Sequence, residues 1–283
     1  MADNKIPLTL ASEQSHRKDK PPLYSDSSTA NLTQTCSTTP FRTTFASLSL
    51  HMTDRIRLLN FPPETMPQIS ALVRTRWRSG IQSERLYGNS YELKLSGTPW
   101  RTGMGWGDWS EQTLNSRLLI MGLLAGLFNM GWVLNAAVDI SRKEFDKDTL
   151  ILRAQRPPPP ACEWMFVNFS SGDSLHLVGA PKELGTSLVQ AYGREVQRYN
   201  TTTDSALKIK FWGYPWRAEG VETVKARELV LVLLEVLEQY GFSLYASIDQ
   251  ECGRGKDSRS SEADVWYCNR QRDWTPGVPI YHH

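Results

Sequence analysis

The sequence predicts an α/β fold of the α+β type with a mixed sheet, made of two tandem, degenerate β-α-β-α-β-β copies. Three observations support this prediction: an internal duplication, alternating strand-like and helix-like hydrophobic patterns, and a change of composition near residue 50. We expect the two copies to pack as a pseudo-twofold unit that follows a disordered N-terminal tail. A chain of 283 residues leaves about 100 residues for each copy, which is a common domain size.

The duplication is clearest in a short motif that occurs twice. The segment 94–101, KLSGTPWR, returns as 210–217, KFWGYPWR, with five of eight residues identical. Farther along, the segments 117–139 and 227–249 share Arg, Gly, Leu, Ala and Asp residues at one constant spacing. A single insertion in each copy accounts for every change of spacing, so a repeat explains the pattern better than chance.

The elements of each copy follow from hydrophobic periodicity and from the position of Pro and Gly. Prolines at 63 and 181 suit the first turn of a helix, and Gly131 and Gly241 suit the left-handed residue after a helix. In copy one we expect strands at 55–61, 91–95, 132–140 and 149–153 and helices at 63–77 and 111–130. In copy two we expect strands at 164–169, 174–179, 207–211, 242–248 and 265–269 and helices at 181–192 and 222–240.

Composition sets the expected domain boundaries. Residues 1–50 contain eight Ser and eight Thr, too many hydroxyl side chains to bury a core, so we expect a disordered tail. Copy one is expected at 52–156, and the prolines at 157–160 form a stiff linker. Copy two with a C-terminal arm then occupies 161–283.

Charge and hydropathy argue against two classes of partner. With 32 basic and 30 acidic side chains, the chain has no strong field for nucleic acid, so a nucleic-acid partner is not expected. Residues 118–138 carry no charge, but the matching copy-two segment contains Glu235 and Glu238. We therefore expect a buried helix and no membrane partner. Scattered cysteines and the lack of a secretory pattern favour a cytoplasmic or nuclear location.

The turn Gly-x-Pro-Trp-Arg, the strand ending in Ala-x-x-Asp, and the C-terminal segments DVWYC at 264–268 and WTPGVPIYH at 274–282 occur together. In these features the chain resembles a family of fungal hypothetical proteins, over roughly residues 52–283. The resemblance implies no activity, cofactor or site residue. It supports the boundary near residue 52.

Two acids are the catalytic candidates. Asp139 and Asp249 end equivalent apolar strands, and ligands of open α/β sheets gather beyond the carboxyl ends of strands. Two carboxylates brought together could act as general acid and base. The alternative is that each caps the next turn or pairs with a nearby base, at 142–143 or 254–256. No metal ligand set and no complete catalytic motif occurs, and no cofactor is expected.

Two Trp-Arg pairs are candidates for ligand or partner binding. Trp100 with Arg101, and Trp216 with Arg217, could stack on a ligand and bind its anionic group. The alternative is structural: the Trp fixes the turn in the core and the Arg reaches solvent.

A Gly/Trp-rich stretch at 102–110 occurs in copy one alone. Its Trp106 and Trp109 could close over a ligand or dock on a partner, or they could cover the neighbouring apolar helix. We therefore expect a non-catalytic protein that binds a protein or small-molecule ligand through this stretch and the groove between the copies. The alternative is a small-molecule hydrolase, isomerase or lyase that uses a strand-end Asp, with Arg holding an anionic substrate.

Overall fold

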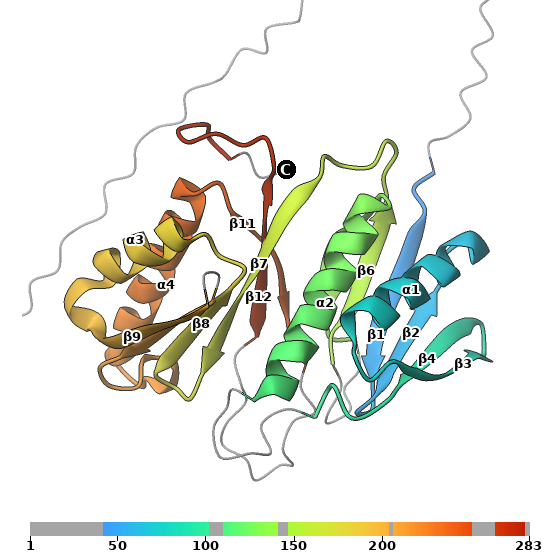
Figure 1. Cartoon of the computed structure of the whole chain (residues 1–283), viewed down its shortest axis with the longest axis horizontal. Helices are drawn as coiled ribbons and strands as arrows, with labels where there is room; N and C mark the ends of the chain where they lie inside the picture. The colour runs from blue at the N-terminus through green and yellow to red at the C-terminus, as the bar shows by residue number, and fades with distance from the viewer. Residues whose placement is uncertain (1–41, 102–109, 141–146, 204–205, 251–263, 281–283) are drawn as a thin grey trace, which may run out of the picture. The chain divides into compact units, whose positions relative to one another are not determined.

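Each copy folds into one six-stranded sheet that carries two helices on one face (Figure 1). The structure is a computed structural model, and it describes residues 42–101, 110–140, 147–203, 206–250 and 264–280. Residues 1–41 of the expected tail, with Trp106 and Trp109, lie outside the described residues.

The elements of copy one are β1 Phe45–His51, β2 Arg55–Leu59, η1 Pro63–Thr65, α1 Met66–Arg76, β3 Ile81–Tyr87, β4 Ser90–Leu95, α2 Glu111–Asn129, β5 Trp132–Val138 and β6 Thr149–Ala154. The elements of copy two are β7 Cys162–Ser170, β8 Ser174–Val178, α3 Lys182–Tyr192, η2 Gly193–Glu195, β9 Val196–Thr203, β10 Ala206–Phe211, η3 Pro215–Arg217, α4 Glu222–Gln239, β11 Ser243–Ile248 and β12 Val265–Gln271.

The strand order is the same in both copies. Sheet A runs β3-β4-β2-β1-β6-β5, and sheet B runs in the equivalent order, β9-β10-β8-β7-β12-β11. All strand pairs of the described residues are antiparallel. The prediction of two tandem α+β copies is confirmed, with antiparallel sheets where a mixed sheet was expected.

Each copy contains more strands than the sequence suggested, in the order ββαββαββ. Strand β1 begins inside the segment assigned to the tail, so the boundary expected near residue 52 falls several residues too late. Its sequence FASLSLH alternates buried and part-exposed side chains, and its serines face away from the core. Strands β3 and β9 were also missed, because they are polar edge strands with few apolar side chains.

Helix α2 is apolar on nearly all sides, and both copies cover it. Its N-cap Ser110 accepts a hydrogen bond from the Thr113 amide, and Gly131 follows its end with φ of 84°. The helix lies between sheet A and the face of sheet B opposite α3 and α4 (Figure 1). Adjacent β7 residues accordingly point into different cores: Phe166 into the α2 core and Val167 into the α3/α4 core. No helix of the described residues is long and apolar enough to cross a membrane.

The contact between the two copies is asymmetric, whereas pseudo-twofold packing was expected. Their edge strands β5 and β11 lie in contact, and the Leu134 amide donates a hydrogen bond of 2.6 Å to the Tyr245 hydroxyl. Helix α2 packs on β7, but α4 packs on α3 and β11 of its own copy, on the far side of sheet B (Figure 1). The copies are therefore stacked in tandem, and the helix packing is not reciprocal.

The glycines of α2 allow α1 to approach closely. A Cβ atom at Gly126 would overlap the Leu72 side chain, and copy two has Val236 at the equivalent position. We expect Gly126→Val to lower the free energy of unfolding by about 2 kcal/mol, because overpacking forces the two helices apart. Urea unfolding measures this change, with Asn129→Val at the exposed end of α2 as the control. Equal stabilities of the two variants would contradict the close helix contact.

Candidate functional site

The strand-end acids of both copies collect at one end of the two sheets. Asp139 and Asp249 follow β5 and β11, while Asp148 and Asp264 precede β6 and β12. The Asp249 amide donates to Asp148 Oδ2 at 2.9 Å, and the Asp148 amide donates to the Asp249 carbonyl at 3.4 Å. The structure thus brings the two sequence candidates together through Asp148, which the sequence did not single out.

The electrostatics of this acid cluster centre on Asp148. Burial raises the pKa of Asp148, and the charges of Asp264 and Asp139 raise it further against the opposing Asp249 hydrogen bond. Asp139, Asp249 and Asp264 are exposed, and Asp148 is half-buried. A carboxyl group with a raised pKa can exchange protons with a ligand. Among the described residues, no group of three or more His, Cys, Asp or Glu side chains could hold a metal ion.

The two Gly-x-Pro-Trp-Arg turns have the same geometry. Trp100 Nε1 donates to the Arg55 carbonyl at 3.1 Å, and Trp216 Nε1 donates to the Ser174 carbonyl at 3.0 Å. Trp100 is fully buried, whereas Trp216 is half-buried. Each indole therefore fixes its turn to the second strand of its copy, β2 or β8.

The arginines of these turns are exposed. Arg101 and Arg217 both lie at the surface, and the Arg217 side chain lies against Gly172 in the turn between β7 and β8. A Cβ atom at Gly172 would come within 2.8 Å of Arg217. The turn in copy two thus presents an exposed Arg217 next to a half-buried Trp216.

A groove of about 470 Å³ opens beside Trp216 in copy two. Its lining includes the aromatic side chains Phe169, Trp216 and Trp266, with Ala226, Ser247 and Asp264. Phe169 meets Trp216 and Trp266 edge to face, with ring centroids 4.9 Å and 5.2 Å apart. Ser247 Oγ donates to Asp264 Oδ2 at 2.8 Å, which holds the carboxylate at the groove. The groove therefore joins a sequence candidate, Trp216, to the acid cluster.

The equivalent space in copy one is filled. By the repeat spacing and strand register, Trp100, Leu50, Leu150 and Ile120 correspond to Trp216, Phe169, Trp266 and Val230. All four copy-one side chains are at most 2% exposed. The open groove is therefore a property of copy two and not of the shared fold.

A buried polar network joins the two copies next to the acid cluster. Arg117 of α2 is 1% exposed. Its Nε donates to Asn168 Oδ1 at 3.3 Å and its Nη1 donates to Gln250 Oε1 at 3.4 Å. Tyr267 donates to the Arg117 carbonyl at 3.4 Å and accepts a hydrogen bond from Gln250. In the sequence, Arg117 stands out only as a residue that the two copies share, although an arginine within an apolar helix is itself a signal.

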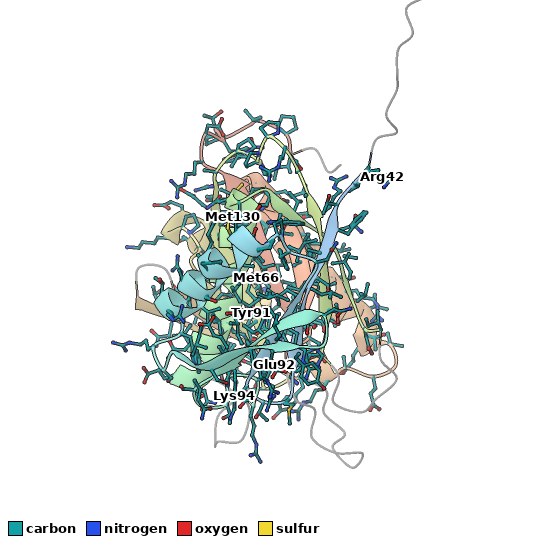
Figure 2. All side chains as sticks on the ribbon, turned by 90° about the vertical axis from the view of Figure 1, so that its right-hand side faces the viewer. Arg42, Met66, Tyr91, Glu92, Lys94 and Met130 are labelled. Atoms are coloured by element: carbon teal, nitrogen blue, oxygen red, sulfur yellow. The ribbon has the colours of Figure 1, made fainter. Side chains whose placement is uncertain are left out.

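An arginine cluster on the open face of sheet A was also missed. Glu92 of β4 is 1% exposed, and its carboxylate accepts hydrogen bonds from Arg55 at 2.7 Å, Arg57 at 2.8 Å and Arg85 at 2.9 Å. Burial would raise the pKa of Glu92, but hydrogen bonds from Arg57 and Arg85 and the charge of Arg55 hold it at about 2. Figure 2 labels Glu92 on this strand.

One protein-family model matches the chain twice, over residues 44–153 and 163–269. The chain belongs to this family. Its description names a domain by a protein identifier and states no activity. The two matched ranges coincide with sheets A and B, and the first begins one residue before β1. The search of curated proteins found no match, and the search of solved structures found none either.

Proposed function

We propose that this protein is a non-catalytic binding protein, and that its ligand occupies the aromatic groove of copy two. The observation that carries the proposal is the difference between the copies. The same position is filled in copy one and open in copy two, where three aromatic rings and a carboxylate line it. An apolar pocket with a few polar groups is the usual form of a ligand site.

The charges favour a ligand with an apolar ring and a basic group. Asp264 lies at the groove and interacts with Asp148 of the neighbouring acid cluster. Aromatic faces also attract cations. Arg227 lines the groove as well, but its Nη1 donates to the Thr223 carbonyl of its own helix at 2.6 Å. One side of its guanidinium is thus held at α4, whereas Asp264 lies beside the acids Asp148 and Asp139.

The Gly/Trp-rich stretch belongs to the same proposal. Its last residue, Ser110, and the residue before it, Arg101, lie in copy one, where the Trp100 amide donates a hydrogen bond to the Thr53 carbonyl in the turn between β1 and β2. We propose that Trp106 and Trp109 contribute to capture of a protein or small-molecule ligand. We also propose that the protein acts in the cytoplasm or nucleus and that its family is fungal.

A second function is supported by one observation, the raised pKa of Asp148 between acids of both copies. A small-molecule hydrolase, isomerase or lyase could use Asp139 or Asp249 with Asp148 as general acid and base. Arg101 or Arg217 would then hold an anionic substrate group. Such an enzyme prefers an anionic ligand, whereas the binding proposal prefers a cationic one.

Blocking the groove tests the binding proposal. We expect the wild-type chain to bind 2-naphthylmethylamine more tightly than 2-naphthoate, measured by quenching of tryptophan fluorescence. Ala226→Trp places a ring in the groove, and we expect it to weaken amine binding about tenfold or more. Glu228→Trp adds the same ring to an exposed position of α4 outside the groove and serves as the control.

The outcome separates the two functions. Preference for the amine, lost in Ala226→Trp and kept in Glu228→Trp, supports the binding proposal. Tighter binding of the naphthoate, or amine binding that Ala226→Trp leaves unchanged, overturns it. Circular dichroism of each variant checks that the fold is retained.

A further inference from the structure

Copy one shows that the open face of the sheet can bind an anion. Glu92 provides that anion from within the chain, and three guanidinium groups on the neighbouring strands β2 and β3 surround it. Charge-assisted hydrogen bonds of this kind are the strong ones in proteins. Basic side chains at this position of the fold thus converge on one carboxylate.

Copy two has a cation where copy one has the anion. Glu92 of β4 lies opposite Arg57 of β2, and Lys208 of β10 lies opposite His176 of β8. These are equivalent positions, because β10 and β8 repeat β4 and β2 at the same register. The substitution removes the internal carboxylate from the equivalent face of sheet B, the one opposite α3 and α4, and adds a positive charge there.

A second lysine on the same strand is retained and neutralised in both copies. Lys94 lies 4.0 Å from Asp54, and Lys210 lies 3.1 Å from Asp173. Figure 2 labels Lys94 near Glu92 on β4. The copies therefore share one ion pair on this face and differ in the residue two positions earlier.

The face of sheet B opposite α3 and α4 is hollowed at its β9–β10 edge. A hollow of about 420 Å³ is lined by Arg198, Asn200, Lys208 and Lys210, together with Tyr199. Within the described part of the chain, Arg198 and Lys208 form no ion pair. With Lys210 neutralised by Asp173, the charges of Arg198 and Lys208 have no acidic partner among the described residues, and the exposed Asn200 amide beside them can donate hydrogen bonds.

We propose that this hollow binds a phosphate group, which takes the place that the Glu92 carboxylate occupies in copy one. A phosphate dianion matches the charges of Arg198 and Lys208. The planar guanidinium of Arg198 can bind two phosphate oxygens, and the Lys208 ammonium and Asn200 amide can bind others. The site lies on the face of sheet B opposite α3 and α4, so it is distinct from the aromatic groove beside α4.

The test is a titration of the full chain with inorganic phosphate. The melting temperature is measured at each phosphate concentration and compared with the melting temperature in sodium chloride of equal ionic strength. We expect phosphate to stabilise the protein more than acetate or chloride does, because binding to the native state alone raises its stability. We expect Lys208→Glu and Arg198→Ala to raise the phosphate dissociation constant about tenfold or more. Arg194→Ala, another exposed arginine outside the hollow, is the matched control.

The variants keep the proposal falsifiable. Lys208→Glu introduces the residue that copy one carries at the equivalent position, and Arg198 is exposed, so both variants should fold, as circular dichroism would check. Phosphate binding that survives both substitutions, or that Arg194→Ala weakens equally, would overturn the site. Parallel titrations with glycerol 3-phosphate and O-phosphoserine identify which phosphate source binds more tightly.

Discussion

Glu92→Gln is expected to lower the free energy of unfolding at pH 7 by about 2 kcal/mol. The substitution keeps the size of the side chain and removes the charge that Arg55, Arg57 and Arg85 share. The pKa of Glu92 falls from 4.5 to about 2, which corresponds to about 3 kcal/mol at about 1.4 kcal/mol per unit. Because the arginines are partly exposed to solvent, screening reduces this value.

The pH dependence identifies the cause. The folded state lowers the pKa of Glu92, so the stabilisation is complete above pH 4.5 and is lost as pH falls toward 2. The stability difference between wild type and Glu92→Gln should therefore shrink across this range in urea unfolding. Glu163→Gln removes an exposed carboxylate paired with Arg270, and we expect it to change stability by less than about 0.5 kcal/mol. A difference that stays constant with pH would assign the Glu92 effect to packing.

The helices of this protein could be predicted almost completely from the sequence, and the strands only in part. Helix α2 ends within one residue of the expected 111–130, because Ser110 and Gly131 supply local start and stop signals. Strand β1 depends on sheet partners on both sides, β2 and β6, for its burial. Its Ser-rich open face looked like part of the tail, because composition does not show which partner strand will cover a side chain.

The candidate site could be predicted less well, because its parts depend on tertiary contacts. Repeat equivalence placed Asp139 and Asp249 at matching strand ends, but only the contact between β5 and β11 brings them to Asp148. The Lys-x-Lys pattern of β10 is typical of a solvated strand face. That this face is hollowed, and that Glu92 fills the equivalent place in copy one, follows from comparing the two sheets.

Arg117→Ala is expected to destabilise the protein by about 3 kcal/mol. The substitution leaves a cavity between α2 and sheet B, and it deprives Asn168 and Gln250 of a donor in a buried interface. Arg117→Met fills much of the space without restoring the hydrogen bonds, so we expect it to cost less than the alanine variant. Urea unfolding followed by far-ultraviolet circular dichroism measures both.

The duplication supplies the control for Arg117. Arg227 occupies the equivalent position of α4 but is exposed, so Arg227→Ala should change the free energy of unfolding by less than about 0.5 kcal/mol. Arginine at equivalent positions of the two copies is thus expected to contribute differently to the free energy of unfolding. Sheet B covers α2 at Arg117, whereas no such layer of the described residues covers Arg227. Equal losses in the two alanine variants would mean that Arg117 stabilises its own helix rather than the contact between the copies.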